Sequence, residues 1–176
     1  MSARDLLAKV FTASATSIAV AIAVAVAPAT ATADIPFWQI SEGLQKCLDV
    51  TNGSTLDGAI MQQWNCNGGE NQQFFDESVV AGYYRIRTVE TGRCLGVSNN
   101  STKDLAPIEQ RLCASGFPAY QEWKFIPTGT PNQYEFQAKS SGKCMDVRGM
   151  STADGAVIQQ FTCNKTSNQI WSFSIL

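Results

Sequence analysis

The sequence predicts an all-β fold built from three copies of a four-stranded repeat, with one disulfide in each copy. Three observations predict it. The string "KCLDV" at 46–50 recurs as "RCLGV" at 93–97 and "KCMDV" at 143–147, six cysteines form three equally spaced pairs, and short β-type stretches fill every copy. A repeat length close to fifty residues is typical of folds made from one repeated supersecondary unit.

The strands are justified in order by alternating apolar and polar residues between turn signals. The third repeat is the clearest, because its four stretches are "YEFQAK", "KCMDV", "AVIQQFTC" and "QIWSFSI", and "SSG" joins the first two. The second repeat has "YYRIRTV" and "RCLGV" joined through "ETG", and the first begins with "FWQIS". No helical periodicity is long enough to predict a helix. The predicted repeats cover about residues 35–80, 81–129 and 130–176.

The cysteines predict structural disulfides. Six cysteines allow fifteen pairings, but equivalent segments of a repeated structure carry equivalent bridges, and each successive pair is 19 positions apart. A cysteine metal cluster is disfavoured because the chain has no C-x-x-C pair, so we expect no metal site. The predicted bridges are Cys47–Cys66, Cys94–Cys113 and Cys144–Cys163.

The N-terminal segment has the order of a secretory signal. A positively charged start precedes an apolar run at 18–27, and Ala31-Thr32-Ala33 forms a small-residue cleavage site. The well-placed cleavage site disfavours the alternative, an uncleaved membrane anchor. We therefore predict a signal peptide at 1–33 and a secreted, extracellular domain at 34–176, where disulfides are the expected state of cysteines.

The composition excludes several function classes. The formal net charge is −2 without a basic run, which gives no electrostatic case for nucleic acid or an anionic membrane. The chain has no histidine, so it contains neither a Ser-His-Asp nor a Cys-His nucleophile system, nor a histidine zinc site. We predict no enzyme activity, no catalytic residue and no cofactor.

Three motifs carry a specific resemblance: the Cys-x-Asp strand, the Gln-x-aromatic-x-Cys strand and a closing Gln-x-aromatic triplet. The triplets are Gln72-Gln73-Phe74, Gln121-Glu122-Trp123 and Gln169-Ile170-Trp171. Together they resemble the ricin-B-type lectin β-trefoil and are similar to family 13 carbohydrate-binding modules of secreted bacterial glycosidases. The resemblance covers about residues 37–176. It implies a six-stranded barrel capped by three hairpins, with up to three shallow sugar pockets.

Two of the repeats supply the groups that a neutral sugar needs. A carboxylate accepts hydrogen bonds from hydroxyls, amides donate and accept, and an aromatic ring packs under the C–H face. By resemblance, the aspartate binds two hydroxyls and the ring stacks on the sugar. The candidate sugar-binding residues are Asp49, Gln62, Trp64, Asn71 and Gln72 in the first repeat and Asp146, Gln159, Phe161, Asn168 and Gln169 in the third.

The middle repeat keeps the fold residues and loses the sugar residues. Its changes are Gly96 for the aspartate, Glu109 for the glutamine, Arg111 for the ring and Tyr120 for the asparagine. It retains both cysteines, Gln121 and Trp123. The sequence therefore predicts two sugar pockets and a degenerate middle repeat, and the phenyl ring of Phe161 suggests a third pocket that is weaker or differently selective.

Structural interpretations compete with these assignments. Both aspartates could cap turns, although this does not explain why the other sugar residues disappear together with the aspartate in the middle repeat. Gln72 and Gln169 remain ambiguous, since Gln121 persists without a pocket. We assign to the core the aromatic residues of the closing strands, Phe74, Trp123 and Trp171.

The resulting hypothesis is a secreted, non-catalytic lectin, acting as a monomer on galactose-type sugars or on plant polysaccharide such as xylan, arabinan or galactan. The alternative is a protein-binding or inhibitory β-trefoil without sugar binding. A glycosidase is disfavoured because it needs two neighbouring carboxyl groups, whereas the sugar-site aspartates lie on separate repeats.

Overall fold

The computed structural model describes residues 37–41 and 46–175. The predicted signal peptide at 1–33 lies outside these residues. Within the described part of the chain, no helix has both the length and the apolar character needed to cross a membrane.

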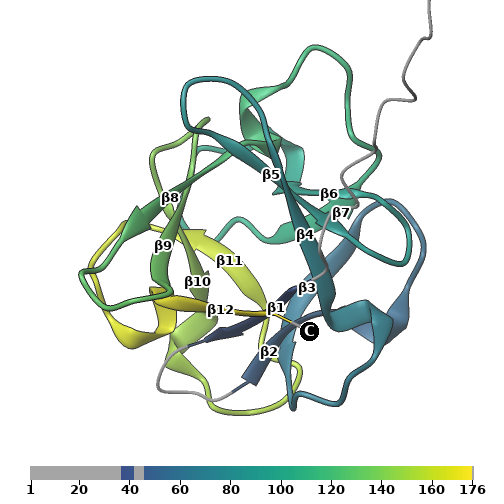
Figure 1. Cartoon of the computed structure of the whole chain (residues 1–176), viewed down its shortest axis with the longest axis vertical. Coiled ribbons are helices and arrows are strands. Elements are labelled where there is room, and N and C mark those ends of the chain that lie inside the picture. The colour runs from purple at the N-terminus through teal and green to yellow at the C-terminus, as the bar shows by residue number, and fades with distance from the viewer. Residues whose placement is uncertain (1–36, 42–45, 176) are drawn as a thin grey trace, which may run out of the picture. The chain divides into compact units, whose positions relative to one another are not determined.

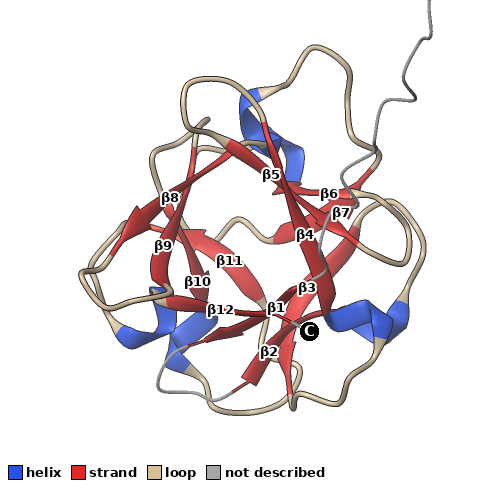
Figure 2. Ribbon diagram, in the orientation of Figure 1, coloured by secondary structure: helices blue, strands red, loops and turns tan. Residues whose placement is uncertain are grey.

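Twelve strands and six short 3-10 turns make up the described structure (Figure 2). The strands are β1 (Phe37–Ser41), β2 (Lys46–Val50), β3 (Ala59–Trp64), β4 (Gln73–Ser78), β5 (Tyr84–Thr88), β6 (Cys94–Val97), β7 (Ile108–Arg111), β8 (Trp123–Pro127), β9 (Gln133–Ala138), β10 (Cys144–Val147), β11 (Ile158–Phe161) and β12 (Trp171–Ile175). The turns are η1 (Thr51–Gly53), η2 (Glu70–Gln72), η3 (Ser98–Asn100), η4 (Ala119–Gln121), η5 (Arg148–Met150) and η6 (Ser167–Gln169).

Six of the strands close into a barrel. Antiparallel pairing runs from β1 to β4, β5, β8, β9 and β12 and returns to β1, and these labels follow one another around the ring in Figure 1. The other six strands form the hairpins β2–β3, β6–β7 and β10–β11. A six-stranded barrel with three hairpins is the β-trefoil, so the predicted fold is confirmed.

The core repeats three times, as the sequence does. Equivalent apolar positions from the three repeats meet inside, and each is at most 2% exposed. Burying one such side chain contributes roughly 1.5–3 kcal/mol. The core assignment of the closing aromatics is confirmed, and two of them bind the backbone as well: Trp123 donates to the Leu95 carbonyl at 3.0 Å and Trp171 to the Met145 carbonyl at 3.1 Å. The first three equivalent sets are Leu48, Leu95 and Met145; Val50, Val97 and Val147; and Met61, Ile108 and Ile158.

All three predicted disulfides are present, one in each repeat. Each joins the start of a hairpin to the segment that follows it, with Cα–Cα separations of 5.1, 5.0 and 5.0 Å. In the chain-entropy account, closing a loop of this size contributes about 3 kcal/mol.

Buried glutamines join each repeat to the preceding one, a feature the sequence did not reveal. Gln110 of the second repeat donates to the carbonyls of Ser54 (2.5 Å) and Leu56 (3.0 Å) in the first. Gln160 of the third repeat donates to the carbonyls of Ser101 and Lys103 in the second. Gln63 of the first repeat donates to those of Ser151 and Ala153 in the third, so the contacts form a closed cycle. These three glutamines, fully buried, hold the hairpin loops in place.

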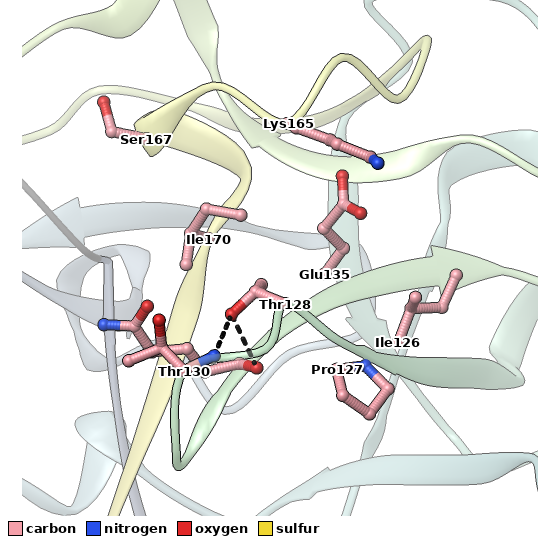
Figure 3. A pocket seen from close by; sticks show the side chains of 9 residues that line it. Ile126, Pro127, Thr128, Thr130, Glu135, Lys165, Ser167 and Ile170 are labelled. Carbon is pink, nitrogen blue, oxygen red and sulfur yellow. Dashed lines mark hydrogen bonds between the residues drawn. The ribbon is translucent and has the colours of Figure 1, made fainter.

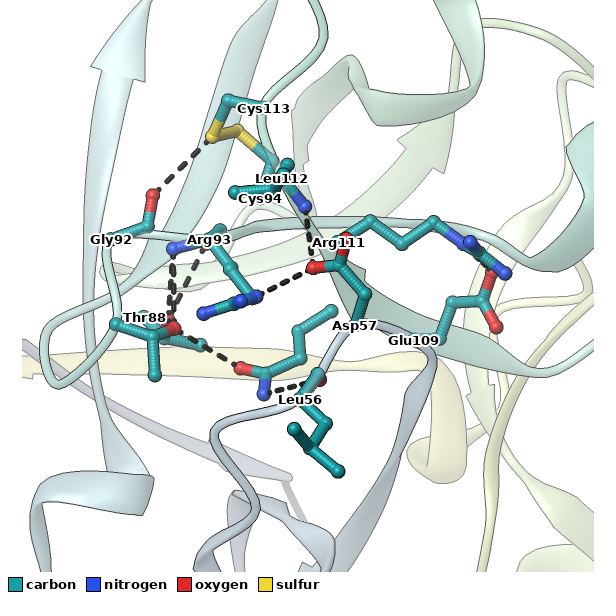
Figure 4. Close-up of polar contacts among 12 residues, drawn as sticks. Leu56, Asp57, Thr88, Gly92, Arg93, Cys94, Glu109, Arg111, Leu112 and Cys113 are labelled. Carbon is teal, nitrogen blue, oxygen red and sulfur yellow. Dashed lines mark hydrogen bonds and ion pairs between the residues drawn. A yellow bond between two sulfur atoms is a disulfide. The ribbon is translucent and has the colours of Figure 1, made fainter.

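Ion pairs also join the hairpin loop of each repeat to the next repeat in the same cycle. Asp57 in the first hairpin loop binds Arg93 of the second repeat at 2.6 Å and accepts the backbone N–H of Leu112 at 2.9 Å (Figure 4). The equivalent pairs are Asp104–Lys143 and Asp154–Lys46, each at 2.7 Å. Because these pairs are partly exposed, each adds little stability, but together they fix where each loop meets the next repeat.

Candidate functional site

The first repeat gathers its predicted polar residues around one carboxylate. Asp49 on β2 lies opposite Gln62 on β3, and the Gln62 amide donates to Asp49 Oδ1 at 2.8 Å. Asn71 and Gln72 donate to Asp49 Oδ2 at 2.7 and 2.9 Å. Asp49 is 2% exposed, and burial raises its pKa above the ordinary value of 3.8, against the lowering effect of the three amides.

The third repeat reproduces this cluster. Gln159 donates to Asp146 Oδ1 at 2.9 Å, while Asn168 and Gln169 donate to Oδ2 at 2.8 and 2.9 Å. Asp146 is 3% exposed, and burial again raises its pKa although the same three hydrogen bonds oppose the shift. Two independent segments of the chain thus build the same arrangement of four side chains.

The second glutamine of each cluster, Gln72 or Gln169, binds both the aspartate and the backbone that follows the disulfide. The Gln72 side chain donates to the Asn65 carbonyl and accepts the Asn67 N–H, both at 3.0 Å, which pins the segment after the disulfide. Gln169 makes equivalent contacts with Thr162 and Asn164. In the middle repeat Gln121 makes the same two hydrogen bonds to the backbone, and all three glutamines are fully buried. Their structural role is therefore clear, and in the first and third repeats they also hold the aspartate in place.

The two predicted rings lie at the ends of β3 and β11. Trp64 pairs across the hairpin with Cys47 and is 39% exposed. A Cβ on Gly155 would lie 3.8 Å from both the Trp64 ring and Gln62 Oε1, so ring and amide converge at this glycine. Phe161 holds the equivalent place opposite Cys144.

The third repeat contains an open hollow of about 340 Å³. Six residues that the sequence did not single out line it as well, and three of them, Leu105, Arg148 and Met150, join the aspartate cluster to its surroundings. Arg148 donates to Gln159 Oε1 at 2.6 Å and to the Leu105 carbonyl at 3.0 Å, which joins the hollow to the preceding repeat. The predicted residues that line this hollow are Asp146, Gln159, Phe161 and Asn168.

A loop of the preceding repeat lies beside the first cluster and beside the hollows of the second and third repeats. Gly155 of the third repeat lies against the first cluster, Leu105 of the second lines the third hollow, and a Cβ on Gly58 of the first would lie 3.9 Å from the Arg111 guanidinium. These three residues are equivalent within their repeats. No motif within a single repeat identifies them, because their role depends on how neighbouring repeats meet.

The middle repeat keeps a smaller hollow with different chemistry. It measures about 260 Å³ and is lined by Asn99, Asn100, Arg111 and Tyr120. Arg111 donates to Glu109 at 2.5 Å (Figure 4). A Cβ on the residue at position 96 would lie 3.0 Å from both the Tyr120 carbonyl and the Gln121 side chain, so there is no room for an aspartate without rearrangement.

A further cavity of about 420 Å³ lies beside the β8–β9 hairpin (Figure 3). Glu135 and Lys165 extend toward one another there, next to Ile170 and Thr128, and none of the predicted sugar-binding residues lines it. Over the described residues, no group of three or more potential metal-binding side chains converges. The two aspartate clusters are therefore the candidate sites, because they combine a carboxylate, amides and a ring.

Comparison with known proteins gives a consistent picture. The family model of the ricin-type β-trefoil lectin domain matches residues 38–171. The α subunit of clotting factor G from Tachypleus tridentatus is 51% identical over 39 residues, which are 22% of this chain and 6% of that protein. The chain thus spans only a small part of that relative.

Two of the solved structures that are similar over most of the chain are about a third identical to it over the aligned residues. A designed threefold-symmetric protein, ThreeFoil, is 35% identical with a TM-score of 0.76, over 80% of this chain and 99% of its own. An exo-β-1,3-galactanase from Clostridium thermocellum, 1,3Gal43A, is 33% identical with a TM-score of 0.76, over 81% of this chain and 30% of the enzyme. With the fold, the disulfides and the family match in agreement, the chain belongs to the ricin-type β-trefoil lectin family and contains a carbohydrate-binding β-trefoil.

Proposed function

We propose that this protein is a secreted, non-catalytic lectin with two sugar sites, one in the first repeat around Asp49 and one in the third around Asp146. The observation that carries the proposal is the recurrence of one arrangement, a buried carboxylate held by three amides near a ring, in two of three repeats. A purely structural aspartate does not explain this pattern, because the middle repeat folds the same way with Gly96.

The cluster is suited to binding hydroxyl groups. An ionised carboxylate accepts about four hydrogen bonds, and in each cluster three come from protein amides. Oδ1 of Asp49 receives only one of them, and so does Oδ1 of Asp146. The protein donors hold the carboxylate rigidly, which reduces the entropy lost when a sugar binds.

The ligand class that we propose is galactose-type sugars or plant polysaccharide such as galactan, xylan or arabinan. The similarity to an exo-β-1,3-galactanase supports testing galactose-containing glycans first. Each shallow site should bind with a dissociation constant of about 0.1–10 mM. Two sites on one rigid monomer gain avidity on a polymer that displays many sugars.

The absence of catalysis is part of the proposal. Glycoside hydrolysis uses two carboxyl groups about 5–10 Å apart on either side of the bond. Asp49 and Asp146 lie on separate repeats, and the acids whose charge acts on them, Asp154 and Asp104, are paired with lysines. Release of sugar from galactan or xylan by the pure protein would contradict this part.

Ring substitution tests the proposed sites without disturbing the buried hydrogen bonds. We expect Trp64→Ala and Phe161→Ala each to lower retention on a galactan or xylan column, about tenfold in site affinity, because the sugar C–H face loses its apolar contact. Arg111→Ala is the matched control, since Arg111 occupies the same position in the middle repeat, and it should leave retention unchanged. A glycan and polysaccharide binding screen on the unmodified protein identifies the column to use.

If all three variants are retained equally, the rings have no part in binding and the proposed sites are wrong. Should the unmodified protein bind no glycan while capturing a protein partner, the alternative function as a protein-binding trefoil is favoured.

The proposed sites also predict acid sensitivity. The ionised aspartate is a stronger acceptor for a sugar hydroxyl than the protonated one, and burial raises the pKa of both Asp49 and Asp146. Binding should therefore be lost on acidification at a pH above 3.8, the ordinary value. A raised folded-state pKa means that the protonated carboxyl stabilises the folded state. This stabilisation is complete below the unfolded-state pKa, and it is lost as the pH rises through the folded-state pKa. Titration of these two groups does not itself unfold the protein in acid. Glycan retention measured against pH, with circular dichroism at each point, checks this, and a midpoint below 3.8 would argue against it.

A further inference from the structure

Two apolar residues that line the third hollow, Leu105 and Met150, have an unusual backbone conformation, and we call them the rim residues. Leu105 has φ of 70° and Met150 has φ of 53°, both in the left-handed region. The residues equivalent to Leu105 are Gly58 and Gly155, with φ of 83° and 81°. Those equivalent to Met150 are Gly53 and Asn100, with φ of 57° and 49°.

The fold does not require these side chains. The left-handed conformation is unfavourable for residues with a Cβ other than asparagine and aspartate, and glycine adopts it freely. The other repeats use glycine or asparagine at these positions. Leu105 and Met150 are each 54% exposed, so burial in the core does not offset the conformational cost. Strained residues of this kind cluster at ligand sites.

The rim is held rigidly next to the aspartate cluster. The Leu105 N–H donates to the Gln160 carbonyl at 2.9 Å, and its own carbonyl accepts from Arg148 at 3.0 Å. Arg148 also binds Gln159, which donates to Asp146. A chain of hydrogen bonds thus connects the position of Leu105 to the carboxylate that would anchor the sugar.

We infer that Leu105, Met150 and Phe161 form an apolar subsite beside Asp146, so that the third site prefers glycosides with an apolar aglycone. This inference rests on the proposed sugar-binding function. The first site has Gly155 and Gly53 at the two rim positions and lacks these contacts. The two sites therefore bind the same type of sugar but differ in what they accept next to it.

Single-site variants of the full chain test this difference. Asp49→Ala leaves the third site, and Asp146→Ala leaves the first; Trp64→Ala replaces Asp49→Ala if that variant does not fold. Calorimetry with p-nitrophenyl and methyl β-D-galactopyranoside, and with the corresponding β-D-xylopyranosides, gives the aryl preference of each site. We expect the third site to favour the aryl glycoside about tenfold and the first site to show a markedly smaller preference.

Rim variants in the third-site background assign the preference to the two side chains. Leu105→Gly and Met150→Gly should each lower the affinity for the aryl glycoside more than the affinity for the methyl glycoside, which reduces the aryl preference. Both should melt at the same or a higher temperature, because glycine relieves the backbone strain. Leu56→Gly is the matched control, since Leu56 lies in the equivalent loop of the first repeat and is 70% exposed, and it should leave the aryl preference unchanged.

The outcomes separate the two proposals. Equal binding of aryl and methyl glycosides at the third site overturns the apolar subsite and leaves the lectin function intact. An aryl preference that survives both rim variants also overturns it. If neither single-site variant binds any of the four glycosides, although both are folded, the result counts against the proposed function itself.

Discussion

Replacing both Asp49 and Asp146 with alanine should abolish retention on a carbohydrate matrix, while each single replacement weakens it. Among the described residues, each aspartate is the one carboxylate that the amides of its cluster hold in place. Without it the hollow keeps amide donors but loses the strong acceptor for sugar hydroxyls. A single replacement also removes the avidity of two sites on one polymer, which is worth about a hundredfold or more.

The measurement is column retention and glycan affinity for the three variants, each accompanied by a thermal melt. The melt is needed because alanine leaves three amide groups in each cluster without their acceptor, at a cost of about 1–3 kcal/mol for each buried group left unsatisfied. The ring variants Trp64→Ala and Phe161→Ala leave these amides paired, so they separate lost binding from lost folding. A folded double variant with undiminished retention would end the proposal.

The second large effect concerns stability. We expect Gln110→Ala to lower the free energy of unfolding by about 2–4 kcal/mol, since it removes two buried hydrogen bonds, leaves the Ser54 carbonyl without its side-chain donor, and leaves a cavity. Gln160→Ala should cost a similar amount, because Gln160 also holds two loop carbonyls and its own Oε1 accepts from Ser141 at 2.7 Å.

Gln63→Ala should cost less than either. Its amide holds the third hairpin loop in the same way, but within the described residues its buried Oε1 has no hydrogen-bond donor, so removing it relieves an existing penalty. Urea unfolding curves for the three variants give the ranking. Gln137→Ala is the matched control, since Gln137 also donates to a backbone carbonyl, at 2.9 Å, but at a more exposed position. If Gln110→Ala unfolds no more easily than Gln137→Ala, the glutamine cycle does not stabilise the fold.

The loop contacts explain why the sequence predicted the repeat better than the site. The alternation of strands, the equal cysteine spacing and the closing aromatics are all internal to one repeat, so a repeated pattern was enough to find them. The aspartate clusters were also found, because Asp49, Gln62 and Asn71 belong to one repeat and recur together in another. Leu105 and Met150 were missed, since their importance lies in a hollow shared between repeats and in a backbone angle.

Other details depended on side-chain packing. The sequence left the role of Gln72 and Gln169 open, and the structure shows each of them fully buried, with its amide bound to both a backbone carbonyl and the aspartate. It also identified Gly96 as the loss of an acceptor, but only the structure shows that a Cβ at this position would lie 3.0 Å from both the Tyr120 carbonyl and the Gln121 side chain.

The amino-acid sequence by itself determined the threefold β architecture, the pairing of its cysteines and the loss of the sugar residues in the middle repeat. These follow from hydrophobic alternation and from equivalence between repeats, which are properties of the chain read in one dimension. The tertiary structure decided which loop lies beside which hollow, how Gln63, Gln110 and Gln160 close the cycle of repeats, and where strained side chains stand at a rim. These depend on the rotation that relates one repeat to the next, because that rotation brings residues more than fifty positions apart into contact.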